Sequence, residues 1–225
     1  MTYEMIHRYA ERLGPELHEF ARRISTARGG RGLGEGASDL IEARMSTSLE
    51  YDLVFRDAME NIVGIMVGAG KGPAVLLRSA GVGMGNRPAR ENGKDLPVGL
   101  VSQVYAGYVL SEAGMFPRGT IVVSISFSGT ESGEQENRYL LEHTLPSLNI
   151  DPGFAILSGE SCSCSSHEAE NSATAATCVL TTDHAIPSVT LDTASSRQGR
   201  SFPCGDRLVE TTYLAARLTY RFLLG

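Results

Sequence analysis

The sequence predicts an α/β fold, a three-layer sandwich with a mixed, largely parallel sheet. Short runs rich in apolar and β-branched residues alternate with segments of helical periodicity along the 225 residues, as in chains whose strands are connected by helices. One run, Ala74–Leu77, is continuously apolar, which is typical of a strand buried on both faces. We find no internal repeat and no linker, so residues 1–225 are predicted to form one domain.

Strand-like segments are separated by turn-forming residues. They are Tyr51–Phe55, Asn61–Val67, Ala74–Leu77, Gly119–Phe127, Phe154–Leu157 and Ile186–Leu191. The strongest pattern is that of Gly119–Phe127, which reads Gly-Thr-Ile-Val-Val-Ser-Ile-Ser-Phe. These segments supply the strands of the predicted sheet.

Helical periodicity marks the segments between and around the strands. They are Thr2–Ile24, Ser38–Thr47, Leu96–Ala113, Glu131–His143, Ala173–Thr182 and Asp206–Leu224. In the first of them, Ile6, Tyr9 and Leu13 fall near one face at helical spacing. The Gly14-Pro15 pair is expected to break this helix, because proline cannot donate to the helical hydrogen-bond ladder.

Composition narrows the class of protein. The chain is 42% hydrophobic and 20% charged with a net charge of −6, which is typical of a globular protein and lacks the basic stripe of a nucleic-acid binder. No run of about 18 apolar residues predicts a membrane span. The first residues lack the apolar region of a signal peptide, and the chain has only 4 cysteines. We therefore expect a cytoplasmic protein that binds neither nucleic acid nor membrane.

Two motifs lie in an order that a known family shares. Asp57–Gly64 reads Asp-Ala-Met-Glu-Asn-Ile-Val-Gly and is similar to a family strand, Asp-x-x-Gly-Asn-Val-Ile-Gly. Gly159-Glu160-Ser161 follows a predicted strand and is similar to a Gly-Glu-Pro-Thr strand end. With the segments between them, these motifs resemble the catalytic domain of the M20 family of zinc metallopeptidases and deacylases, from about Leu33 to the end of the chain.

The departures from the family concern its zinc ligands. The family places His-x-Asp after the strand at Leu77, where this sequence has Ala80 and Val82. Asp95 matches the bridging aspartate of the family, and Glu160 matches a further ligand position. Glu131 is the one carboxylate in the segment that matches the family's Glu-Glu pair, in a register that the sequence leaves open. The family's last histidine aligns with Ser201.

Since zinc needs three or four N, S or O ligands, the resemblance implies a degenerate domain. We expect no metal, no other cofactor and no peptidase activity. Cys162, Cys164 and His167 offer an alternative group of metal ligands, although a polar loop is the simpler interpretation. The family also inserts a lid domain between the strands at Glu160 and Ile186, and here a short loop and helix, residues 161–185, are expected in its place.

A candidate site follows from the predicted strand ends. The expected catalytic residues are carboxylates that can take a proton from an amine: Asp95, Glu131 and Glu160. The expected substrate-binding residues are arginines and hydroxyls that can hold a carboxylate, phosphate or sulfate: Arg78, Ser79, Thr130, Ser161, Arg197, Arg200 and Ser201.

Three functions fit this set of residues. The first is a metal-independent enzyme of a secondary-metabolite pathway that acts on an amino-acid-derived small molecule, free or bound to a carrier protein. By length and pathway context rather than by motif, it is similar to a subunit of the two-subunit aziridine-forming enzymes of azinomycin-type biosynthesis, in which an amine displaces sulfate. The second is a non-catalytic binding or scaffolding subunit of a partner enzyme. The third is a residual metallohydrolase. The first two imply a second protein subunit.

Overall fold

The structure is a computed structural model that describes ten stretches of the chain. They are residues 2–27, 35–70, 72–80, 97–115, 117–127, 130–159, 175–176, 179–180, 186–192 and 204–224. The predicted sites at Cys162, Cys164 and His167 lie outside these residues.

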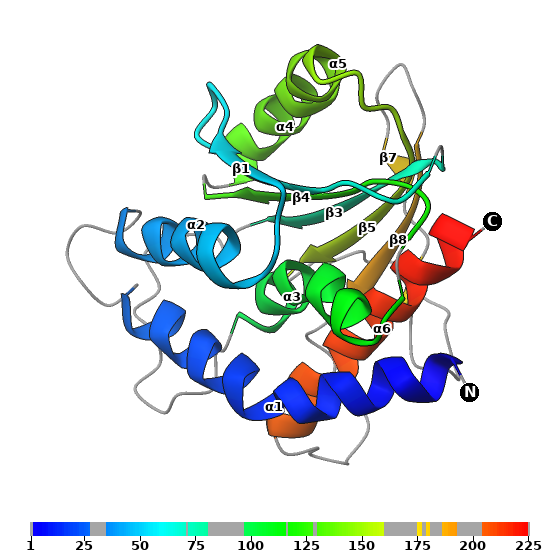
Figure 1. The fold of residues 1–225 in the computed structure, drawn as a ribbon. Helices are drawn as coiled ribbons and strands as arrows, with labels where there is room; N and C mark the ends of the chain where they lie inside the picture. Colours follow the sequence, from blue (N-terminus) through cyan, green and yellow to red (C-terminus); the bar gives the residue numbers. More distant parts are fainter. Residues whose placement is uncertain are drawn as a thin grey trace.

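One mixed sheet forms the centre of the molecule (Figure 1). Its strands are β1 (Leu53–Arg56), β2 (Ile62–Met66), β3 (Ala74–Ala80), β4 (Ile121–Ser126), β5 (Pro152–Gly159), β6 (Ala175–Ala176), β7 (Val179–Leu180) and β8 (Ile186–Asp192). The spatial order is β1-β2-β4-β3-β5-β8-β6, and β7 also pairs with β8. Strands β4, β3, β5 and β8 run parallel, whereas β1, β2, β6 and β7 pair antiparallel to their neighbours. The predicted mixed, largely parallel sheet is confirmed.

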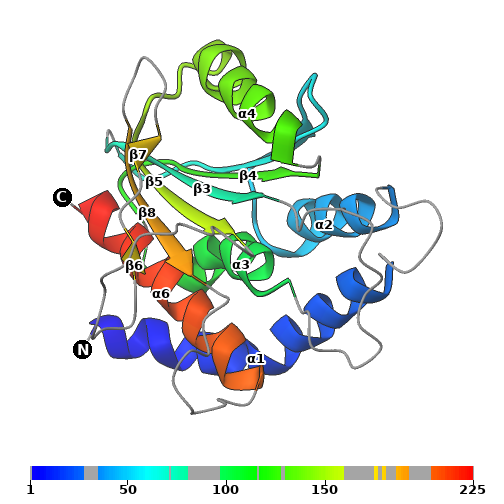
Figure 2. The same ribbon diagram turned by 180° about the vertical axis from the view of Figure 1, so that it is seen from behind.

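Helices cover the sheet on both faces (Figures 1 and 2). On one face lie α4 (Thr130–Tyr139), a π-helical turn η1 (Leu140–Thr144) and α5 (Leu145–Ser147). On the other face lie α2 (Glu35–Ser48), α3 (Val98–Glu112) and α6 (Cys204–Leu224), with α1 (Thr2–Ala27) packed against α3 and α6. This arrangement is the predicted three-layer sandwich.

Alternation along β4 divides the core between the two faces. All six residues of β4 are buried. Val123 and Ile125 join the larger apolar cluster with α1, α2, α3 and α6, whereas Val122 joins the smaller cluster beneath η1 and α5. Successive strand residues point to opposite faces, so Ser124 and Ser126 share the face of Val122.

Two predictions about helices are wrong. Helix α1 continues through Gly14 and Pro15. A Cβ built on Gly14 would lie 3.2 Å from the side chain of Val209, so the glycine lets α1 lie close to α6, and this packing offsets the cost of the proline. The expected helix at Ala173–Thr182 is absent from the described residues there, which form β6 and β7 against the open edge of β8.

None of the described helices is both long enough and apolar enough to cross a membrane.

Candidate functional site

The carboxyl ends of the parallel strands meet at one edge of the sheet. Strands β3, β4, β5 and β8 run in the same direction, so their carboxyl ends lie at that edge. In parallel α/β sheets this is where ligands bind.

The predicted site residues are distributed unevenly in the structure. Arg78 and Ser79 lie in the last three residues of β3, and Thr130 and Glu131 begin α4, where the structure describes their backbone alone. The remaining six lie outside the described residues: Asp95, Glu160, Ser161, Arg197, Arg200 and Ser201. Glu160 directly follows the last residue of β5.

Arg78 and Ser79 point to opposite faces of the sheet. Arg78 pairs in register with Ser124 of β4 and faces α4. Ser79 pairs with Ile125 and Ser158 and faces α3. The sequence predicts one site for the two residues, whereas the structure places them at the same strand end on different faces.

Beneath α3, Ser79 has polar neighbours. Gln103 Nε2 donates to the Ile156 carbonyl at 3.0 Å. Gln103 Oε1 and Ser158 Oγ are buried and have no hydrogen-bond partner in the described part of the chain. These two atoms could therefore form hydrogen bonds with a ligand on the α3 side of the strand ends.

Opposite charges meet on the α4 face. Arg78 is half-buried, and burial lowers its pKa to about 10, while the charge of Glu136 on α4 acts in the other direction. Glu136 is only 4% exposed. Its pKa is raised by burial and by the charge of Asp57, whereas a hydrogen bond with Ser126 and the charge of Arg78 lower it. We call Asp57, Arg78, Ser124, Ser126 and Glu136 the polar layer.

Asp57 is held by four donors. Its Oδ1 accepts from the backbone N–H groups of Met59 at 2.9 Å and Asn61 at 3.0 Å. Its Oδ2 accepts from Asn61 Nδ2 at 2.9 Å and from Thr144 Oγ1 at 3.1 Å. Asp57 thus ties the β1–β2 turn to η1. In this turn Glu60 has a φ of 62°, at the place where the family pattern has glycine.

The buried part of this site is not among the residues that the sequence predicts. Glu136 belongs to a helix rich in polar residues, so nothing in its sequence distinguishes it from exposed carboxylates nearby. A signal was nevertheless present, because Ser124 and Ser126 alternate with apolar residues in β4 and therefore share one face. Two hydroxyls on one face of a buried strand indicate that a polar partner covers them.

The described part of the chain offers no zinc site of the M20 kind. Strand β3 ends at Ala80, which offers no ligand where the family has histidine. Across the described residues, no three His, Cys, Asp or Glu side chains come together in a way that could hold a metal.

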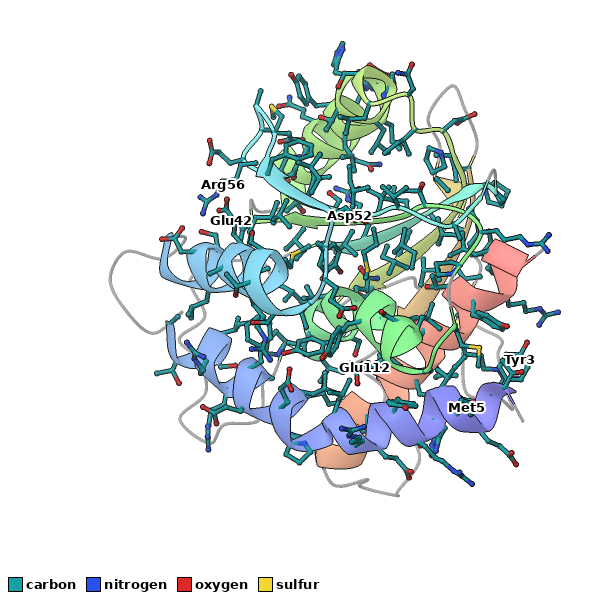
Figure 3. The ribbon with its side chains drawn as sticks, in the orientation of Figure 1. Tyr3, Met5, Glu42, Asp52, Arg56 and Glu112 are labelled. Carbon is teal, nitrogen blue, oxygen red and sulfur yellow. The ribbon has the colours of Figure 1, made fainter. Side chains whose placement is uncertain are left out.

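A surface hollow of about 420 Å³ lies elsewhere, between the beginning of α1 and α6. It is lined by Tyr3, Glu4, His7, Arg8, Glu11 and Tyr213. Figure 3 labels Tyr3 at the beginning of α1, where its ring lies against Arg217 of α6. The hollow shares no residue with the candidate site.

The sheet order and the helices on both faces define the class of fold, an α/β sandwich like the M20 catalytic domain. No protein family matches the sequence, and no curated protein matches it.

Solved structures resemble the chain in fold. LapA from Legionella pneumophila is 11% identical with a TM-score of 0.64, over 98% of this chain and 76% of LapA. LapB from the same organism is 11% identical with a TM-score of 0.52, over 68% of this chain and 44% of LapB. The di-peptidase Dug1p from Saccharomyces cerevisiae is 10% identical with a TM-score of 0.50, over 70% of this chain and 41% of Dug1p. The matches therefore span less than half of LapB and of Dug1p, and at these identities they show the fold alone.

Proposed function

We propose that this chain is a metal-independent M20-like protein that binds an amino-acid-derived substrate and holds an anionic group of that substrate with Arg78. The observation that carries the proposal is Arg78 itself. It is a half-buried guanidinium two residues before Ala80, at the strand end where the family uses a zinc ligand. A guanidinium binds sulfate, phosphate or carboxylate through paired hydrogen bonds.

The reaction that fits such a site is an intramolecular displacement. The nitrogen lone pair of a substrate amine forms a bond to the carbon that carries a sulfate ester. The carbon–oxygen bond breaks, and sulfate leaves with the bonding electrons to give an aziridine. A carboxylate takes the proton from nitrogen, and Asp95, Glu131 and Glu160 are the candidates. Arg78 stabilises the negative charge that develops on the leaving sulfate.

We further propose that the protein works with a second subunit in a secondary-metabolite pathway. In the M20 family a lid domain closes over the substrate. The resemblance implies that this chain has only residues 161–185 in place of that domain. A partner chain would supply the missing cover, and the substrate would enter free or on a carrier protein.

A turnover assay tests the proposal. The protein, alone and with its candidate partner, is incubated with a diamino acid that carries a sulfate ester next to the free amine. Release of inorganic sulfate is measured by ion chromatography, and the product is identified by mass spectrometry. We expect that a chelator does not reduce the rate of sulfate release. We also expect that Arg78→Gln lowers this rate at least tenfold.

Two other results would point to other functions. Activity that disappears with chelator and returns with added zinc would indicate a residual metallohydrolase. Sulfate release by the partner alone, together with a stable complex of the two chains, would indicate a scaffolding subunit.

A further inference from the structure

The polar layer holds unequal numbers of charges. Asp57 and Glu136 are buried carboxylates, 8% and 4% exposed, and Arg78 is the cation whose charge acts on Glu136. Among the described side chains of this layer, one guanidinium against two carboxylates leaves one negative charge when all three groups are ionised. An excess charge in a buried site is costly, and proteins commonly relieve it by taking up a proton.

Glu136 is the member of the layer that can accept this proton at little cost. Both oxygens of Asp57 already accept two hydrogen bonds each. Oε2 of Glu136, in contrast, is buried and has no hydrogen-bond partner among the described residues. Among the described residues, the groups that act on Glu136 are Asp57 from the β1–β2 turn, Arg78 from β3 and Ser126 from β4.

We propose that binding of an oxyanion at Arg78 is coupled to protonation of Glu136. The inference rests on the anion-binding role that we propose for Arg78. A sulfate or carboxylate ligand that binds at Arg78 brings negative charge close to Glu136. Burial and the charge of Asp57 already disfavour the ionised form of Glu136. Protonation of Glu136 removes the repulsion between this carboxylate and the bound anion. Anion affinity and protonation of Glu136 therefore strengthen each other.

Titration calorimetry with sodium sulfate tests the coupling. Ionic strength is held constant with sodium chloride, and sulfate is chosen because it does not titrate between about pH 5 and about pH 8. The heat of binding is measured in buffers of different ionisation enthalpy, which gives the number of protons taken up. We expect uptake of up to about one proton per sulfate, and an affinity that weakens by up to roughly tenfold per pH unit as the pH rises.

Glu136→Gln imitates the protonated carboxyl group. This variant is expected to bind sulfate at about pH 8 as tightly as the wild type does at about pH 5, with no proton uptake. The matched control is Glu142→Gln, which changes an exposed carboxylate on η1 and is expected to behave like the wild type. Weaker sulfate binding by Glu136→Gln would make Glu136 a simple counter-charge for Arg78 and would overturn the inference.

The role of Arg78 and its coupling to Glu136 can be refuted separately. The proposed role of Arg78 is overturned if the wild type does not bind sulfate. It is also overturned if Arg78→Gln binds sulfate as tightly as the wild type does. Sulfate binding that Arg78→Gln abolishes but that takes up no proton overturns the coupling and leaves the role of Arg78 standing. The wild-type calorimetry decides this even if Glu136→Gln does not fold. Acetate in place of sulfate shows whether a carboxylate group binds in the same way.

Discussion

Asp57 is expected to stabilise the fold more than any surface carboxylate. Asp57→Ala leaves four donors without an acceptor, and three of them belong to buried hydrogen bonds, the Asn61 backbone N–H, Asn61 Nδ2 and the Thr144 hydroxyl. A buried donor without a partner costs about 1–3 kcal/mol. The side-chain donors can rotate toward other partners, so the expected loss in the free energy of unfolding is about 3–5 kcal/mol.

Urea unfolding followed by circular dichroism measures this loss. The matched control is Asp52→Ala, because Asp52 accepts one exposed hydrogen bond, from the Val67 N–H at 2.7 Å. The control is expected to change the free energy of unfolding by at most about 0.5 kcal/mol. Asp57→Asn keeps a carbonyl oxygen as the acceptor for two of the donors and places its NH2 group against the other two. The expected loss in the free energy of unfolding is therefore about half of that for Asp57→Ala. A loss below about 1 kcal/mol for Asp57→Ala would refute the reasoning.

Three further predictions concern the fold. Gly119→Ala is expected to cost at least about 3 kcal/mol in urea unfolding, because its Cβ would lie 1.8 Å from a backbone carbonyl oxygen, whereas Gly70→Ala meets nothing closer than 3.7 Å and serves as the control. Glu60→Gly is expected to stabilise the protein by about 0.5–1 kcal/mol by relieving its positive φ, and a lower melting temperature would contradict this. Because folding raises the pKa of Glu136, this carboxyl group contributes to the free energy of unfolding at low pH. The contribution is complete below the pKa that the group has in the unfolded chain, and it is lost as the pH rises through its pKa in the folded protein. Thermal unfolding at several pH values should therefore show that Glu136→Gln flattens this decline, and an unchanged pH profile would count against it.

The sequence predicted those elements whose signal is local. The strand at Ala74–Leu77 was predicted because a continuous apolar run is a property of the segment itself. The break at Gly14-Pro15 was wrong because the contact with Val209 lies far along the chain. Similarly, β6 and β7 depend on an open edge of β8, which no local pattern of residues 173–182 reveals.

The same distinction applies to the candidate site. Arg78 was selected because it follows a predicted buried strand, and the structure places it at the expected edge of the sheet. Glu136 was missed because its burial comes from the way α4 lies on β4, a tertiary contact. The alternation of Ser124 and Ser126 was readable in the sequence, but it indicated a polar partner without identifying one.

The outer strand of the sheet carries a charge that bears on how the protein behaves in concentrated solution. Among the described strands β1 pairs with β2 alone, so its other edge offers free backbone groups to any extended chain. Arg56 closes β1 and is held by Glu42 at 2.7 Å and by Asp39, and Figure 3 shows Arg56 beside Glu42 at this margin. Arg56 thus opposes edge-to-edge aggregation, in the way that charged side chains on edge strands do in other sheets.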